Sequence, residues 1–232
     1  MRFLKDIFLK FSAKARQKRA EIFRTSFKVS PSTTILDLGS EDGSNIKSVI
    51  QGLDYAPEKV ILADLDLEIV KRGWSQHNFR AVVIDENARL PFRDKAFEIV
   101  YCSSVIEHTT VPKDIVWQLA DTKSFAEQSF RRQAALADEI RRVGKSYFVQ
   151  TPIWSFPIES HSWLPFLSYM PRPLLLKILK LSNRFWIKKT IPDFNLLSRS
   201  QMQKLFPEAT IITEKAFGMD KSVIAVYLSD DK

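Results

Sequence analysis

The chain has 232 residues, 45% of them hydrophobic and 27% charged, which suits one globular domain with room for an added segment. Its single cysteine, Cys102, excludes a disulfide framework and a CxxC zinc or redox motif. One cysteine is also typical of a reducing compartment, so we expect a cytoplasmic protein. The net charge of +8 is concentrated at one end, because residues 1–28 hold nine Lys and Arg against two acids.

Residues 1–28 predict a basic amphipathic helix. Two interpretations of this helix stay open: it packs on the body of the protein, or it meets an anionic surface, either lipid or a substrate carrying phosphates. The second interpretation corresponds to peripheral docking at the inner membrane face. Charged residues interrupt the opening too early for a signal peptide, and no apolar run is long enough to span a membrane. The apolar positions at helical spacing are Phe3, Leu4, Ile7, Phe8 and Phe11.

Beyond this helix, short apolar runs alternate with helical patterns. This alternation predicts an α/β fold with a doubly wound, mostly parallel sheet of about seven strands and helices on both faces. The last two runs are expected to form an antiparallel hairpin that turns at Met219-Asp220-Lys221. The expected strands are 33–39, 59–66, 80–85, 97–104, 145–152 and the closing hairpin over 209–228. Residues 29–232 are interpreted as a single domain, with an α-helical and aromatic cap inserted at about 153–206.

The turn after the first strand, ILDLGSEDGSN at 35–45, is the first candidate ligand site. In open parallel sheets, ligands bind beyond the carboxyl ends of the strands. Gly39 and Gly43 allow the backbone to turn sharply and approach a ligand closely. Asp37 lies inside the strand, whereas a nicotinamide-binding fingerprint has a purely apolar strand before its glycines.

This order of residues resembles class I S-adenosylmethionine (SAM)-dependent methyltransferases, whose first motif has the form (V/I)LDLGxGxG. The stretch LPFRDKAFEIVYCSSVIEH at 90–108 is similar to LPFxDxSFDxVxxxxxxEH, the signature of the type 11 group. The resemblance implies a Rossmann-like methyltransferase fold, with SAM as cofactor and S-adenosylhomocysteine as product. It also implies a small-molecule acceptor, and the similarity of residues 151–172 to a bacterial subset favours a saccharide or lipid-linked metabolite.

The resemblance assigns the cofactor residues to strand ends. Asp64 would bind the two ribose hydroxyls, since a carboxylate offers two acceptor oxygens, while Asp66 is expected to cap the following helix. Near the third strand, strand alternation favours Asp85 and the spacing from the next motif favours Glu86, with Glu86 or Asn87 facing the adenine amino group. The complete expected set is Asp37, Gly39, Ser40, Glu41, Gly43, Asp64, Leu65, Asp85, Glu86, Asn87 and Ser103.

Two histidines are candidate general bases for a hydroxyl acceptor. His108 follows the fourth strand, beside the expected position of the reactive methyl, and His161 follows Glu159 by two residues. Either ring could instead be structural. No metal site is expected, because no third and fourth ligand lie at metal-binding spacing. The expected acceptor-binding residues are Trp154, Phe156, Glu159 and Trp163, which could equally form the core of a lid.

Two other functions compete with methyl transfer. A SAM-binding module without turnover is favoured only by Glu41, which stands where the family has glycine. A nucleic-acid methyltransferase is suggested by the basic N-terminal segment, but the rest of the chain is nearly neutral and no NPPY-type motif for a flipped base is present. We therefore do not expect a nucleic-acid partner. The sequence leaves the oligomeric state open.

Overall fold

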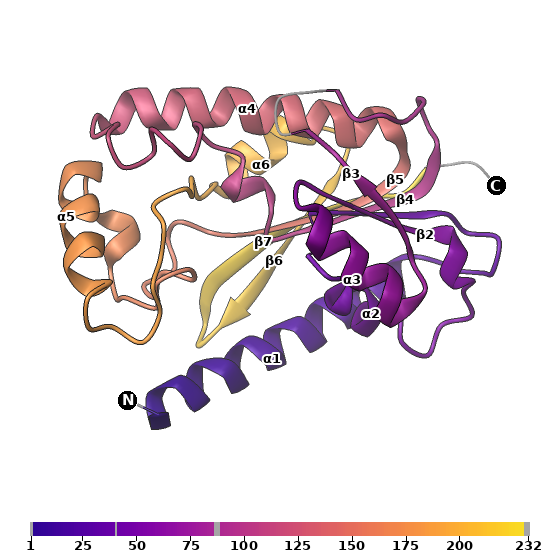
Figure 1. Ribbon diagram of the computed structural model, residues 1–232, viewed down its shortest axis with the longest axis horizontal. Helices are drawn as coiled ribbons and strands as arrows, with labels where there is room; N and C mark the ends of the chain where they lie inside the picture. The colour runs from indigo at the N-terminus through magenta and orange to yellow at the C-terminus, as the bar shows by residue number, and fades with distance from the viewer. Residues whose placement is uncertain (1, 40, 86–88, 230–232) are drawn as a thin grey trace.

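The computed structural model describes residues 2–39, 41–85 and 89–229 and contains a seven-stranded sheet (Figure 1). The strand order is β3-β2-β1-β4-β5-β7-β6. Strands β1 to β5 are parallel, and β7 is antiparallel to both β5 and β6. The predicted α/β sheet with an antiparallel end is confirmed. The strands are β1 Ile35–Leu38, β2 Val60–Asp64, β3 Arg80–Val83, β4 Phe97–Ser103, β5 Gly144–Pro152, β6 Thr210–Ala216 and β7 Met219–Tyr227.

The predicted position of the closing turn is wrong by two residues. Met219, Asp220 and Lys221 belong to β7, and the turn consists of Phe217 and Gly218. Both turn residues have positive φ, 52° and 78°. Such a two-residue turn matches the right-handed twist of antiparallel strands. The glycine, which accepts positive φ without steric cost, was therefore the better signal.

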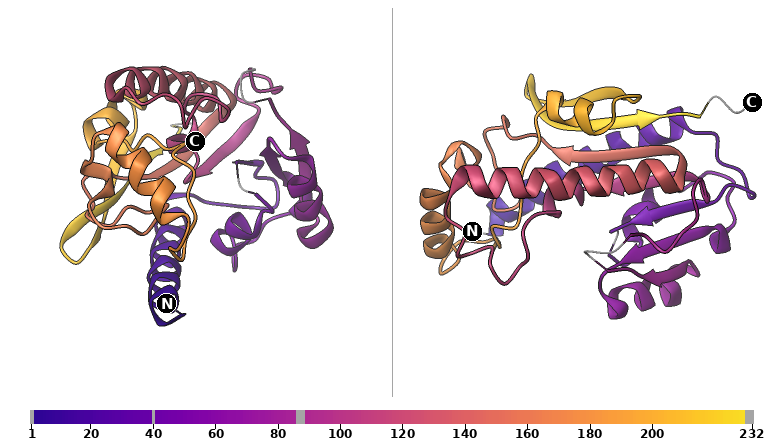
Figure 2. Two further views of the ribbon diagram at one scale, coloured as in Figure 1. Left: turned by 60° about the vertical axis from the view of Figure 1, so that its left-hand side comes forward. Right: turned by 90° about the horizontal axis from the view of Figure 1, so that it is seen from above.

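Helices cover both faces of the sheet, so β1 and β4 are buried on both sides (Figure 1). On one face lie α1 Arg2–Ser26, α2 Ser44–Val49 and α3 Leu67–His77. On the other face, α4 Thr122–Val143 runs along the sheet beside α6 Arg199–Leu205 (Figure 2). Burial on both faces explains the continuous apolar runs. The short 3₁₀ turns are η1 Pro57–Lys59, η2 Ile106–His108 and η3 Leu167–Tyr169.

Helix α1 packs on the body along much of its length. Phe23 is fully buried and meets the rings of Tyr101 and Phe148 edge-on, at centroid distances of 5.6 and 5.7 Å. Further towards the N-terminus, Phe8 stacks on Trp163. Phe23 of α1 therefore packs on the sheet and Phe8 on the segment after β5, while Leu9 stays 45% exposed. Among the described residues, no helix has the length and apolar character needed to cross a membrane.

The segment after β5 has a small core of its own. Helix α5, Arg172–Ser182, packs with Leu167 and Phe194 in this core. Arg172, at the start of α5, is only 4% exposed. Its guanidinium donates to the carbonyl oxygens of Val116, Leu119 and Pro192 at 2.6–3.2 Å. This side chain ties α5 to the loops before α4 and α6.

Candidate functional site

The turn after β1 has the glycine geometry that the motif requires. Gly39 and Gly43 have φ of 71° and 77°. A Cβ atom on Gly39 would lie 2.6 Å from Cγ1 of Val105, so a side chain there would clash. Glu41 also has positive φ, 58°, and thus adopts the conformation of the glycine it replaces. Ser40 lies outside the described residues.

Asp64, at the end of β2, connects this turn to the next one. Its Oδ2 accepts from the Glu41 N–H at 3.1 Å, and its Oδ1 accepts from the Leu65 N–H at 2.7 Å. Both oxygens retain lone pairs for a further donor. Asp66 caps α3 as predicted, accepting from the N–H groups of Glu68 and Ile69.

A cleft of about 850 Å³ opens at the carboxyl ends of β1 and β2. Five expected cofactor residues line it together: Gly39, Glu41, Asp64, Leu65 and Asp85. Its opposite wall includes Leu90 and residues of α4. A mainly apolar cleft of this size with a few polar groups at one end suits a nucleoside-containing ligand.

The other expected cofactor residues lie away from this lining. Asp37 is 1% exposed and sits in β1 opposite Leu62 and Tyr101, behind the cleft. Gly43 is buried against Leu62 and Phe79. The Ser103 hydroxyl donates to Oε1 of Gln150 at 2.8 Å. Glu86 and Asn87 lie outside the described residues.

Arg142 of α4 holds the loop that forms one wall of the cleft. Its guanidinium donates to the carbonyl oxygens of Leu90 and Phe92 and to the carboxylates of Glu139 and Asp94, at 2.6–3.1 Å. The Leu90 N–H in turn donates to Glu139 at 2.8 Å. The hydrogen bond from Arg142 lowers the pKa of Glu139 below its usual value.

Replacing Arg142 by alanine should lower the free energy of unfolding by about 2–4 kcal/mol at pH 7, since two carbonyl oxygens and the Glu139 carboxylate lose a charged donor. A carboxyl with a lowered folded-state pKa stabilises the fold above its unfolded pKa and loses that effect as the pH falls. The difference between wild type and Arg142→Ala should therefore shrink between pH 7 and pH 3 in urea unfolding. Arg141→Ala, which removes a more exposed side chain, should cost about 1 kcal/mol or less. An equal loss at both pH values would contradict the assigned role of Glu139.

A second cavity, of about 260 Å³, lies between α1, β5, β7 and the segment after β5. Phe156 and Trp163, two of the residues predicted to bind the acceptor, line it. Trp154 is 43% exposed and packs against the Tyr169 ring instead. Ser104 and His108 line both cavities, so the two spaces meet at these residues.

The lining of the second cavity is rich in cations. Among the described residues, Arg16, Arg19, Lys188 and Lys221 line it together with one carboxylate, that of Glu214. Arg19 is held by Glu214 at 3.5 Å and donates to Gln150. Burial and the neighbouring arginines lower the pKa of Lys221 to about 8, although Glu214 opposes the shift. The excess of cationic side chains over carboxylates in this lining would favour an anion in the cavity.

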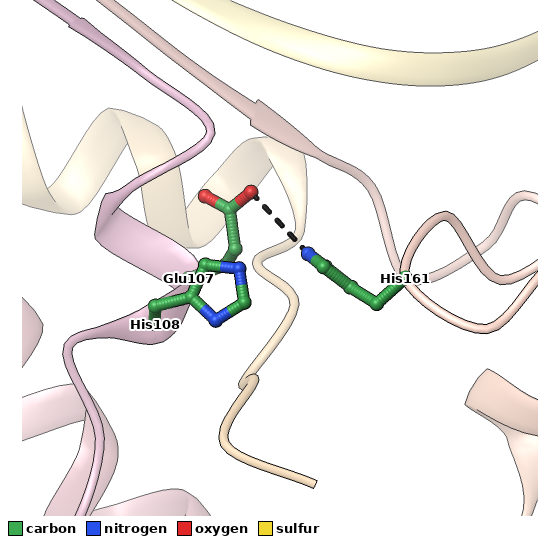
Figure 3. Close-up of side chains that lie close together, drawn as sticks. All are labelled: Glu107, His108 and His161. Carbon is green, nitrogen blue, oxygen red and sulfur yellow. Dashed lines mark ion pairs between the residues drawn. The ribbon is translucent and has the colours of Figure 1, made fainter. Parts of the chain in front are cut away.

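Both candidate bases lie at this junction. The rings of His108 and His161 meet edge-on, with centroids 4.6 Å apart. Nδ1 of His108 is 3.2 Å from Oδ1 of Asp193, and Nδ1 of His161 is 2.6 Å from Oε1 of Glu159. Glu107 completes the group, with Oε1 3.7 Å from Nε2 of His161 (Figure 3).

Burial disfavours the charged form of His161, but Glu107 and Glu159 outweigh it and raise the pKa of the ring to about 9. Burial likewise raises the pKa of Glu159, but the bonds from His161 and Ser162 lower it to about 2. At neutral pH the His161 ring is thus an imidazolium, and it is not available as a base. Glu159 is 1% exposed and supports His161 from behind the cavity.

Sequence reasoning missed several residues of the site. Glu107 lies within the motif ending in Glu-His, but its contact with His161 joins positions 54 apart in the chain. Arg19 and Gln150 are paired across 131 positions. Asp193 comes from the loop after α5. Gln150 did give a local signal, because a polar residue near the end of a buried strand indicates a polar site at that edge of the sheet.

Comparison with known proteins agrees with the fold and the first motif. Residues 36–122 match a family model described as a methyltransferase domain. The curated proteins contain no match. A chain of the Haloferax volcanii complex that contains the Trm112 methyltransferase activator is similar over 94% of this chain and 93% of its own, with 13% identity and a TM-score of 0.58.

Two further solved structures have the same fold. The N-terminal domain of EvdMO1, determined in the presence of SAH and D-fucose, has 15% identity and a TM-score of 0.51, covering 92% of this chain and 83% of that chain. A Nostoc punctiforme protein named as an O-methyltransferase has 10% identity and a TM-score of 0.53, covering 94% and 58%. At these identities the likeness shows the fold. Together with the family match, it confirms the resemblance drawn from the sequence motifs.

Proposed function

This chain carries a methyltransferase domain of the class I type, and from this premise we propose that it transfers a methyl group from SAM to a small-molecule acceptor bearing an anionic group. The observation that carries the proposal is the meeting of two cavities at Ser104 and His108. The larger cavity holds the cofactor and the smaller one the acceptor.

The residues of the larger cleft fit the cofactor. Gly39 leaves no side chain between the backbone and the ligand, and Asp64 offers carboxylate oxygens to a vicinal diol. Leu65 and Leu90 supply apolar surface. When bound, SAM would supply an electrophilic methyl carbon to the acceptor oxygen, with the S–C electron pair left on sulfur and the hydroxyl proton released. The protein contributes mainly by aligning the acceptor with that carbon.

The smaller cavity supports a compact acceptor with negative charge. Arg16, Lys188 and Lys221 would bind a phosphate or carboxylate group, and the faces of Phe156 and Trp163 would hold a sugar ring. A charged saccharide derivative agrees with the acceptor class that the sequence favours. His108 is the candidate base for the acceptor's hydroxyl group, because it lines both cavities, and the His161 ring lies beside it.

The basic helix is used within this proposal to bind the acceptor. Arg16 and Arg19 face the smaller cavity, and Phe8 and Phe11 contribute to its wall. In this proposal these four side chains of α1 form part of the acceptor cavity. Docking of the same helix at an anionic membrane stays a prediction.

Calorimetric titration with SAM and with S-adenosylhomocysteine, followed by transfer of labelled methyl groups to a panel of sugar phosphates, uronic acids and neutral sugars, tests the proposal. We expect both nucleosides to bind and the anionic acceptors to be methylated. Binding without transfer to any acceptor would favour the non-catalytic module. Failure of both nucleosides to bind would refute the proposed function.

Replacing Lys221 by methionine should raise KM for an anionic acceptor about 10- to 100-fold, since one charge-assisted contact is lost. Methionine keeps an apolar chain beside the Phe11 ring, over which the Lys221 ammonium lies at 4.4 Å. The Kd for SAM should not change. Lys215→Met, at an exposed position of β6, is the matched control. A KM equal to that of the control would show that the cavity does not bind the anion through Lys221.

A further inference from the structure

Glu107, His108 and His161 form a compact group of metal-ligating side chains at the junction of the two cavities. Each offers one ligand atom, and these atoms lie within 4.8 Å of one another. Figure 3 shows the Glu107 carboxylate and a nitrogen of each ring directed towards a common point. Two residues come from η2 and one from the segment after β5, so the fold supplies the third ligand that sequence spacing did not reveal.

Both rings are oriented by carboxylates on their far sides. Oε1 of Glu159 accepts from Nδ1 of His161, and Oδ1 of Asp193 lies 3.2 Å from Nδ1 of His108. Because a carboxylate only accepts, each Nδ1 carries a proton and each Nε2 is left to bind a cation. Carboxylate partners of this kind are the usual outer support of metal-binding histidines.

The Glu107 carboxylate needs a cation. Its side chain is 0% exposed, and neither oxygen has a hydrogen-bond partner among the described residues. A buried charge without hydrogen bonds is costly unless it is paired. Nε2 of His161 approaches Oε1 of Glu107 to 3.7 Å, which is beyond hydrogen-bond distance.

We propose that Glu107, His108 and His161 bind one divalent transition-metal ion. Two imidazole nitrogens and one carboxylate suit Zn²⁺, Fe²⁺ or Co²⁺ better than Mg²⁺ or Ca²⁺, which favour oxygen ligands. Three protein ligands leave an open coordination position. Since His108 and His161 line the smaller cavity, that position faces the acceptor.

The role of the ion rests on the proposed function, whereas its binding does not. The bound ion would hold the acceptor's hydroxyl oxygen at its open coordination position. It would thereby lower the pKa of that hydroxyl, so that the proton leaves to solvent water. The oxygen then bonds to the methyl carbon as the S–C bond breaks with its electron pair on sulfur. His108 and His161 thus act on the hydroxyl as ligands.

Titration of the EDTA-treated full-length protein with Zn²⁺ and Co²⁺, in the absence of SAM, tests the binding. We expect one ion per chain, a raised Tm, and a Co²⁺ visible spectrum typical of four or five ligands. Glu107→Gln and His108→Ala should each weaken binding at least about 100-fold, and Asp193→Asn about 10- to 100-fold. His77→Ala is the matched control, because His77 contacts Ser44, outside the cluster, and it should bind like wild type.

Binding that is undetectable, or equally strong in wild type, Glu107→Gln and His108→Ala, would overturn the metal site. The half-exposed His108 keeps the test decisive if Glu107→Gln does not fold. Methyl transfer that persists undiminished in EDTA would refute the ion's role while leaving the proposed function intact, with an imidazole acting as the base. A failure of SAM to bind would instead count against the proposed function alone.

Discussion

Arg172→Ala should lower the free energy of unfolding by about 3–5 kcal/mol, because three carbonyl oxygens lose a charged donor and a cavity is left. The guanidinium bonds to three carbonyl oxygens and lies 3.3 Å from the centroid of the Phe125 ring. Burial lowers the pKa of Arg172 to about 10. Urea unfolding followed by far-UV circular dichroism measures the loss.

Two companion variants define the cause of that loss. Lys177→Ala changes an exposed residue on the same helix and should be nearly neutral. Arg172→Lys keeps the charge but not the planar fork, so it should recover only part of the stability. A fully stable Arg172→Lys variant would show that charge alone matters. SAM affinity should be retained in each folded variant, since Arg172 does not line the cofactor cleft.

Asp64→Ala should weaken SAM binding by about 2–4 kcal/mol, which corresponds to about a 30- to 1,000-fold higher Kd. Two effects contribute. The ribose hydroxyls lose a charged acceptor, and the Glu41 N–H loses the bond that joins the first turn to β2. Calorimetric titration with S-adenosylhomocysteine gives the Kd without turnover.

Asp66→Ala is the matched control, because it removes an acid two residues away that caps α3. It should cost about 1 kcal/mol of stability and leave the Kd for the cofactor nearly unchanged. Equal losses of affinity in the two variants would show that the ribose does not bind at Asp64.

The strands and their directions could be predicted from the sequence because each strand is specified locally. Apolar runs such as Ile35–Leu38 are buried on both faces, and the alternation with helices permits few topologies. The glycine turn and the Asp66 cap are local for the same reason, since the partners lie within a few residues. The hairpin turn was misplaced although its signal was local, because the charged Asp220 and Lys221 resemble a turn more than Phe217 does.

The candidate site depends on local sequence signals in its cofactor half and on tertiary contacts in its acceptor half. The cofactor half could be predicted, because its residues follow successive parallel strands whose carboxyl ends share one edge of the sheet. Asp64, Leu65 and Asp85 reach one cleft for that reason. Asp37 and Ser103 do not line the cleft. Side chains alternate between the two faces of a strand, and the motif does not indicate which of its residues face the ligand.

The acceptor half was decided by tertiary structure. Arg19 reaches Gln150 of β5 and Glu214 of β6 only because α1 packs against this part of the sheet. Glu107 meets His161 only because the segment after β5 folds back over η2. Such contacts have no sequence period. They arise where buried charges and aromatic rings from distant segments find partners, and the free energy of those pairings depends on burial that only the folded chain creates.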